Sequence, residues 1–163
     1  MYQIGDKIVY PMHGAGIIRA IEEKEILGSV NSYYILEVPT GNISLMVPVK
    51  NAEEIGVRDV VAPSVIDELF TFIANARVQV NENWNKRYRE NMVKIKSGDL
   101  FEIGPIYKYL LEKDKQRGLS SGEKKMFLSA HQILISEIML SLNISLPEAE
   151  ELMKNRLSDA VTA

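Results

Sequence analysis

The spacing of apolar residues changes near residue 63, and this change restricts the fold more than any other feature of the 163-residue chain. Before it, β-branched and aromatic residues form four short runs between turn residues, at residues 7–10, 16–26, 31–38 and 43–47. Such runs predict strands, and Gly28 and Gly41 suit hairpin turns because glycine tolerates positive φ. Four or five short strands within about 60 residues predict a small barrel or a strongly bent sheet, since both limit open edges.

After residue 63 the apolar residues recur at helical spacing. Ser64, which follows Pro63, is predicted to cap the first helix. Later helices are predicted at residues 84–96 and 99–117, and after the capping boxes Ser120-x-x-Glu123 and Ser145-x-x-Glu148. The fold class is therefore predicted to be α+β, with a β module over residues 1–62 and an all-α bundle of about five helices over residues 63–163.

Cysteine is absent, which excludes disulfides and thiolate metal sites. The first residues lack the basic and then apolar pattern of a signal peptide, and no apolar run is long enough to span a bilayer. We therefore expect a cytoplasmic protein without a membrane partner.

The formal net charge of −3 hides an uneven distribution of charge. Residues 80–125 contain 11 Lys and Arg against 7 Asp and Glu, a net charge of +4, whereas residues 1–79 and 126–163 carry −4 and −3. A local basic surface in an acidic chain predicts weak, directed contact with phosphates. The alternative is an ordinary solvated helix face of mixed charge, which is common.

Trp84 is the only tryptophan, and it opens the most basic of the predicted helices, in the sequence Asn-Trp-Asn-Lys-Arg-Tyr-Arg. A large flat ring beside several cations suits a wedge between DNA bases whose phosphates are held nearby. Trp84 also shares a helical stripe with Tyr88, Met92 and Ile95, and such a stripe more often fills a core. The local pattern leaves both interpretations open.

Residues suited to enzyme chemistry are scarce. The two histidines, His13 and His131, are far apart, and His131 lies in an apolar predicted helix, where a structural role is more common than a ligand role. No glycine-rich phosphate loop follows a strand, and helix capping accounts for Ser120 and Glu123. We therefore expect no catalytic residue, no metal site and no cofactor, and the chain is predicted not to be an enzyme.

The segment at residues 10–16, Tyr-Pro-Met-His-Gly-Ala-Gly, is more distinctive. One proline and two glycines predict a tight, shaped loop after the first strand. This loop is interpreted either as a corner of the barrel or as an edge at which a partner docks.

Several motifs follow one another over most of the chain: Val9-Tyr10-Pro11-x-His13-Gly14, Asn51-Ala52-Glu53, Gly56-Val57-Arg58, Asn83-Trp84-x-x-Arg87-Tyr88 and Arg117-Gly118-Leu119-Ser120-x-Gly122-Glu123-Lys124. Together they resemble the CarD/CdnL family of bacterial transcription regulators. The N-terminal module is also similar to the polymerase-binding module of transcription-repair coupling factors. The resemblance implies a small Tudor/SH3-like β-barrel that binds the β subunit of RNA polymerase. It also implies a helical domain that touches promoter DNA at the upstream edge of the melted bubble.

The resemblance assigns DNA-contacting residues as well. Trp84 matches the family tryptophan that wedges into the minor groove, and Lys86, Arg89 and Lys124 match basic residues that contact the DNA backbone. On an ideal helix Lys86 and Arg89 lie away from the Trp84 stripe, whereas Arg87, Asn91 and Lys94 flank it more closely, and Arg87 is a further candidate. The sequence leaves open which basic set faces DNA.

Polymerase-contacting positions of the family are matched here by Lys24, Ile26 and Met46. Relatives carry arginine at the position of Met46, so one ion pair with polymerase is expected to be missing. Lys24 keeps the charge of its arginine counterpart but lacks the bidentate fork of a guanidinium group.

Insertion of an aromatic wedge costs a few kcal/mol of unstacking, so Trp84 is expected to bind melted DNA better than closed duplex. This difference would shift the equilibrium toward the open complex, while the phosphate contacts would carry no sequence information. We expect a monomer that is tethered to polymerase and thereby associated with the nucleoid. The alternative function is a protein–protein interaction adaptor without DNA contact.

Overall fold

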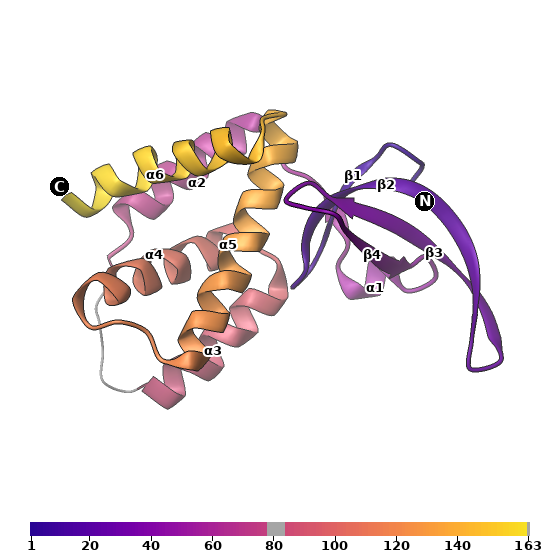
Figure 1. Cartoon of the computed structure of the whole chain (residues 1–163), viewed down its shortest axis with the longest axis horizontal. Coiled ribbons are helices and arrows are strands. Elements are labelled where there is room, and N and C mark those ends of the chain that lie inside the picture. The colour runs from indigo at the N-terminus through magenta and orange to yellow at the C-terminus, as the bar shows by residue number, and fades with distance from the viewer. Residues whose placement is uncertain (78–83, 163) are drawn as a thin grey trace.

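The computed structural model describes the backbone of residues 1–77 and 84–162 and the side chains of residues 1–77 and 87–157. A curved sheet lies at one end of the molecule and a helical domain at the other (Figure 1). The strands are β1 (Lys7–Tyr10), β2 (Gly14–Ile26), β3 (Ser29–Val38), β4 (Ile43–Pro48) and β5 (Arg58–Asp59). The helices are α1 (Ala52–Ile55), α2 (Pro63–Asn75), α3 (Trp84–Ser97), α4 (Leu100–Gln116), α5 (Ser121–Leu142) and α6 (Leu146–Thr162).

The strands form an antiparallel sheet in the order β4-β3-β2-β1-β5. A two-residue turn joins β2 to β3, and Leu27 and Gly28 there have φ values of 53° and 80°, as a type I′ hairpin requires. A β-bulge between Ile18 and Ala20 bends β2, so the sheet curls into a barrel-like shape. Its core consists of Ile8, Ile18, Tyr34, Leu36, Val47 and Ala52. The predicted α+β class is confirmed, with the helical bundle following the strands.

Helix α2 begins one residue before Ser64. Pro63 is its first residue, and Ala62 is the N-cap, with extended backbone and no side-chain capping bond. Proline suits this position because its φ is already helical and its missing N–H would have no partner in the first turn. The prediction that Ser64 caps the helix is therefore wrong.

Both predicted capping boxes are confirmed. The Glu123 N–H donates to Ser120 Oγ at 3.2 Å, and the Ser120 N–H donates to Glu123 Oε1 at 3.0 Å. The same reciprocal bonds link Ser145 and Glu148, at 3.3 Å and 3.2 Å. Because these bonds satisfy N–H groups that lack intrahelical partners, they fix where α5 and α6 begin.

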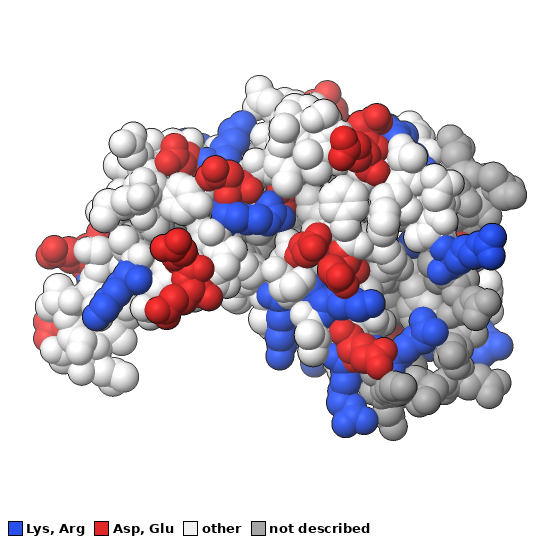
Figure 2. All heavy atoms as spheres, turned by 180° about the vertical axis from the view of Figure 1, so that it is seen from behind, with Lys and Arg blue, Asp and Glu red and all other residues white. Residues whose placement is uncertain are grey.

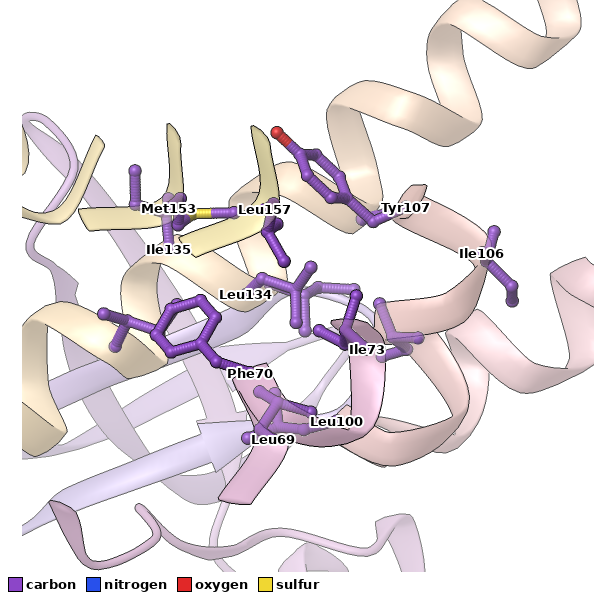
Figure 3. Packing of buried hydrophobic residues seen from close by; sticks show 14 of the residues in the cluster. Leu69, Phe70, Ile73, Leu100, Ile106, Tyr107, Leu134, Ile135, Met153 and Leu157 are labelled. Carbon is purple, nitrogen blue, oxygen red and sulfur yellow. The ribbon is translucent and has the colours of Figure 1, made fainter. Parts of the chain in front are cut away.

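The core of the helical domain lies between α2, α4, α5 and α6, with a contribution from α3. Figure 3 shows side chains of these helices meeting, among them Phe70 from α2, Leu134 from α5 and Leu157 from α6. On α3, Ile95 is buried, and Tyr88 and Met92 are partly buried against the same core. The predicted apolar stripe of α3 is thus confirmed for these three residues.

The C-terminal end of α2 is bound by a buried lysine of α4. Lys108 of α4 is only 5% exposed, and its Nζ donates to the carbonyl oxygens of Ile73, Ala74 and Ala76 at 3.1, 3.2 and 2.8 Å. A positive charge is favourable at this place because the last carbonyls of a helix lack intrahelical donors. Lys108 therefore holds the end of α2 against α4.

We expect Lys108→Met to lower the free energy of unfolding by about 2–3 kcal/mol, because three carbonyl oxygens would lose a charged donor while the apolar stem is kept. Urea unfolding measures this change. Lys96→Met, at an exposed position of α3, is the control and should change stability by less than about 0.5 kcal/mol. A loss below about 1 kcal/mol for Lys108→Met would mean that water can replace the ammonium group.

The segment at residues 10–16 packs against α5. The Ala15 N–H donates to Ser136 Oγ at 2.9 Å, and Val9 and Ala15 form an apolar cluster with Leu140. Gly14 has a φ of 112°, and a Cβ atom there would lie 2.8 Å from Ser136 Oγ. This loop is therefore a corner of the sheet that docks on the helical domain of its own chain.

An ion pair with a buried carboxylate crosses the same interface. Arg58 Nη1 and Nη2 donate to Glu137 Oε2 and Oε1 at 2.7 and 2.8 Å, and Glu137 is 0% exposed. Glu137 Oε2 also accepts the Val61 N–H at 3.0 Å, and Arg58 Nη2 donates to the Gly98 carbonyl oxygen at 2.9 Å. The pair thus links β5, the segment before α2, helix α5 and the turn between α3 and α4.

Candidate nucleic-acid interface

Trp84 is the first residue of α3, and its backbone is helical. The side chains of Trp84 and Lys86 lie outside the described residues. The assignment of Trp84 to a DNA wedge or to the core, and of Lys86 to the DNA backbone, therefore stays a prediction.

The start of α5 lies beside the second turn of α3. A Cβ atom at Gly122 of α5 would be 3.5 Å from the Tyr88 ring of α3. Arg89 of α3 and Lys124 of α5 are both exposed. Two of the cations predicted to contact the DNA backbone are therefore open to solvent on neighbouring helices.

Arg87 has a different environment from Arg89. Its side chain is half-buried, and its Cζ lies 5.7 Å from the centre of the Tyr109 ring of α4. Two residues along a helix correspond to a rotation of about 200°, so Arg87 and Arg89 point away from each other. The structure thus places Arg87 beside α4 and leaves Arg89 in solvent.

Cations gather on the helical domain. Figure 2 shows Lys and Arg side chains over its lower part, beside residues that are not described, with a few acidic side chains among them. Lys96 and Lys125, which the sequence did not single out, are also exposed, on α3 and α5. Their only signal in the sequence is their position in the basic stretch over residues 80–125.

The three predicted polymerase-contacting residues share one face of the sheet. Ala20 and Met46 both pair with Ile35 of β3, and Lys24 and Ile26 follow Ala20 at intervals that keep them on its face. Ile26 is 46% exposed and Met46 is 40% exposed. The structure therefore brings Lys24, Ile26 and Met46 to one solvent-facing surface of β2 and β4.

Lys24 on this surface has an acidic neighbour. Its Nζ lies 3.0 Å from Glu22 Oε2, and both side chains are nearly half exposed. An exposed pair of this kind is weak, so Lys24 can exchange Glu22 for a carboxylate of a partner.

Two family models match different parts of this chain. The CarD-like/TRCF RID domain matches residues 2–61, and the CarD C-terminal domain matches residues 68–154. The chain belongs to the CarD family. YdeB of Bacillus subtilis (strain 168), a protein named as a candidate transcription factor, is 37% identical over 138 residues, or 85% of this chain and 90% of YdeB. CarD-family membership makes the chain a transcription regulator, and the RID-type module implies interaction with RNA polymerase.

Other kinds of site find little support in the described part of this CarD-family chain. Among its described residues, no group of three or more His, Cys, Asp or Glu side chains could hold a metal ion. No single helix in the same residues is long and apolar enough to cross a membrane. Helix α5 and the part of α6 up to Leu157 pass that test only together, and they are bent by 110° at the break between them.

His131 of α5 lies beside the Tyr107 ring, with 6.0 Å between the ring centres. Burial lowers the pKa of His131, and the nearby carboxylate of Glu150 opposes part of this effect. Since the pKa is lower in the folded state, the unfolded chain binds more protons at mildly acidic pH. The contribution of His131 to stability is therefore lost as the pH falls below the unfolded pKa of about 6.5.

We expect the free energy of unfolding to fall less between about pH 7.5 and pH 5.5 in His131→Asn than in the wild type, because asparagine does not titrate. Urea unfolding at a series of pH values measures the difference. His13→Asn, at an exposed position, should keep the wild-type pH dependence. The same slope in the wild type and His131→Asn would contradict the prediction.

Proposed function

We propose that this chain docks on the β subunit of RNA polymerase and stabilises promoter open complexes at the upstream edge of the bubble. In this proposal the β module, residues 1–62, carries the polymerase surface, and residues 63–163 carry the DNA surface. Its main support is that Arg89 of α3 and Lys124 of α5 are both exposed, and that the start of α5, at Gly122, lies against Tyr88 of α3, the helix that Trp84 opens.

The polymerase surface would be the face of β2 and β4 that carries Lys24, Ile26 and Met46. Exposed Ile26 and Met46 offer apolar area, and Lys24 offers one charge whose present partner, Glu22, is held weakly. Met46 cannot form the ion pair that an arginine would make there. Docking would therefore depend more on apolar burial and less on salt than in relatives with arginine at this position.

The DNA surface would hold phosphates without reading sequence. Lys124 lies in the first turn of α5, where the helix dipole adds partial positive charge. Glu123 of the same turn is only 4% exposed, and its Oε2 lies 2.6 Å from Lys113 Nζ. This carboxylate therefore does not offset the positive charge that a phosphate would meet at Lys124.

The interface between the sheet and α5 would make the two surfaces work together. Docking on polymerase raises the local concentration of the DNA surface, so weak intrinsic affinity for DNA is sufficient. The Arg58–Glu137 pair and the Ser136 contact hold α5 against the sheet. A fixed orientation lowers the entropy lost when both surfaces bind at once.

The test is the lifetime of open complexes formed by the cognate polymerase with wild type, Lys124→Glu, Arg89→Glu or no added protein. Wild type should lengthen the lifetime relative to no added protein. Each charge reversal should shorten it by at least about threefold relative to wild type. Each should also reduce the dependence of the lifetime on salt concentration by the amount expected for the loss of about one phosphate contact. Lys154→Glu changes the net charge equally at an exposed position of α6, and it should behave as wild type.

Two results would contradict the proposal. If wild type leaves the lifetime unchanged but still binds polymerase, the chain is an adaptor whose helical domain contacts another protein. If Lys154→Glu shortens the lifetime as much as Lys124→Glu, only the net charge matters and no DNA surface lies at the start of α5.

A further inference from the structure

A groove of about 370 Å³ lies where the end of α2, the middle of α3 and the first half of α4 meet. Arg89 and Lys124 do not line it, so it is distinct from these exposed cations of α3 and α5. Its volume lies within the range of about 300–1,000 Å³ that is usual for small-ligand sites.

The groove is positively charged. Of the described residues that line it, Arg77, Arg87 and Lys94 are cationic and one, Glu102, is acidic. Glu102 Oε2 lies 3.9 Å from Lys94 Nζ. Among the ion pairs between described side chains, none includes Arg77 or Arg87. The two guanidinium groups have no carboxylate partner among the described side chains and share the groove with an ammonium group. This set suits a phosphate because planar guanidinium groups bind its oxygens in pairs.

The groove also offers aromatic rings. Phe72 is 45% exposed, and its ring meets that of Phe101 edge to face, with 5.3 Å between the centres. Tyr109 lies under the guanidinium group of Arg87. An acidic peptide would use the cations but not the open face of Phe72. A nucleotide would use both, since its phosphate binds cations and its base stacks on an exposed ring.

We propose that this groove binds a nucleotide unit, with the phosphate at Arg77, Arg87 and Lys94 and the base against Phe72. The unit comes either from an unpaired DNA strand or from a free nucleotide. Binding of an unpaired DNA strand rests on the proposed function. Positions 84, 87, 91 and 94 share one face of α3, so a DNA strand bound at Trp84 would continue along this face into the groove. The free-nucleotide source does not depend on promoter binding.

The test is an NMR titration of the full ¹⁵N-labelled chain, without polymerase, against dAMP, ribose 5-phosphate and a thymidine hexanucleotide. Amides of the groove should shift with dAMP or the hexanucleotide and respond weakly to ribose 5-phosphate, which has no base. Phe72→Ala should weaken binding about tenfold. Lys94→Glu should weaken binding at least about threefold, and Lys96→Glu, with the same charge change outside the groove, by less than about twofold.

Each outcome decides one point. Binding of the hexanucleotide alone identifies a strand site, and binding of dAMP alone or of both probes identifies a site open to free nucleotides. The proposal is wrong if neither probe saturates by about 10 mM, if ribose 5-phosphate binds as well as dAMP, or if Lys96→Glu acts like Lys94→Glu. These measurements use no promoter, so they can succeed or fail independently of the open-complex assay.

Discussion

Glu137→Gln is expected to lower the free energy of unfolding by about 2–4 kcal/mol, because it leaves the guanidinium group of Arg58, which is 33% exposed, without its charged partner. Glu137 is 0% exposed and accepts three hydrogen bonds, two from Arg58 and one from the Val61 N–H. A glutamine amide can accept from only part of this set, and its NH₂ group would face the donors of Arg58. The loss should appear in urea unfolding followed by circular dichroism.

The chain contains a matched control for this substitution. Arg19 and Glu37 form an ion pair of 2.8 Å, but their side chains are 55% and 53% exposed. Glu37→Gln therefore removes the same kind of charge at the same distance without burial, and it should cost less than about 1 kcal/mol. Equal losses for Glu37→Gln and Glu137→Gln would show that burial of the Arg58 pair has no special weight.

The effect of the same pair on function can be separated from its effect on stability. Arg58→Met combined with Glu137→Leu removes both charges, and it should recover part of the stability because no buried charge is left unpaired. If the pair sets the orientation of the two domains, the double variant should bind polymerase normally and yet lengthen open-complex lifetimes less than wild type. Full activity of a folded double variant would mean that the apolar contact of Leu140 and the hydrogen bond to Ser136 are sufficient.

Local chemistry explains which parts of the fold could be predicted. The turn at Leu27 and Gly28 and the two capping boxes depend on residues within four positions of one another, so the sequence shows all the groups involved. The Ser64 prediction failed at the same range because Pro63 and Ser64 compete for the start of α2, and the fixed φ of proline decided the outcome.

Long-range partners could not be predicted. Arg58 and Glu137 are 79 residues apart, and Ala15 and Ser136 are 121 apart, so no local pattern pairs them. For the same reason the sequence left two roles open for the segment at residues 10–16, and only the position of α5 decides between them. In the candidate site, the charge of residues 80–125 indicated a basic surface, and helical periodicity separated Arg87 from Arg89. The contact of Arg87 with Tyr109 of α4 is long-range and could not be predicted.

Trp84→Ala is expected to shorten the open-complex lifetime by about tenfold or more relative to wild type, which corresponds to about 1.4 kcal/mol of lost stabilisation. An aromatic wedge costs unstacking energy in duplex DNA but little where the strands are already separated. Only an interaction that differs between the closed and open states shifts their equilibrium, and the phosphate contacts of Arg89 and Lys124 are expected to differ less between the two states than the wedge does. Trp84 would therefore account for most of the discrimination between the two states.

Two measurements distinguish this role from packing in the core. A wedge leaves urea unfolding of Trp84→Ala within about 1 kcal/mol of wild type, whereas a core tryptophan costs about 3–5 kcal/mol when truncated. Val93→Ala, on the same helix at a side chain that is 70% exposed, controls for the loss of apolar area on α3. Trp84→Phe keeps a smaller ring and should restore part of the lifetime if stacking is the cause. A folded Trp84→Ala with a wild-type lifetime would leave the phosphate contacts alone to favour the open complex, and their strength would then have to differ between the two DNA states.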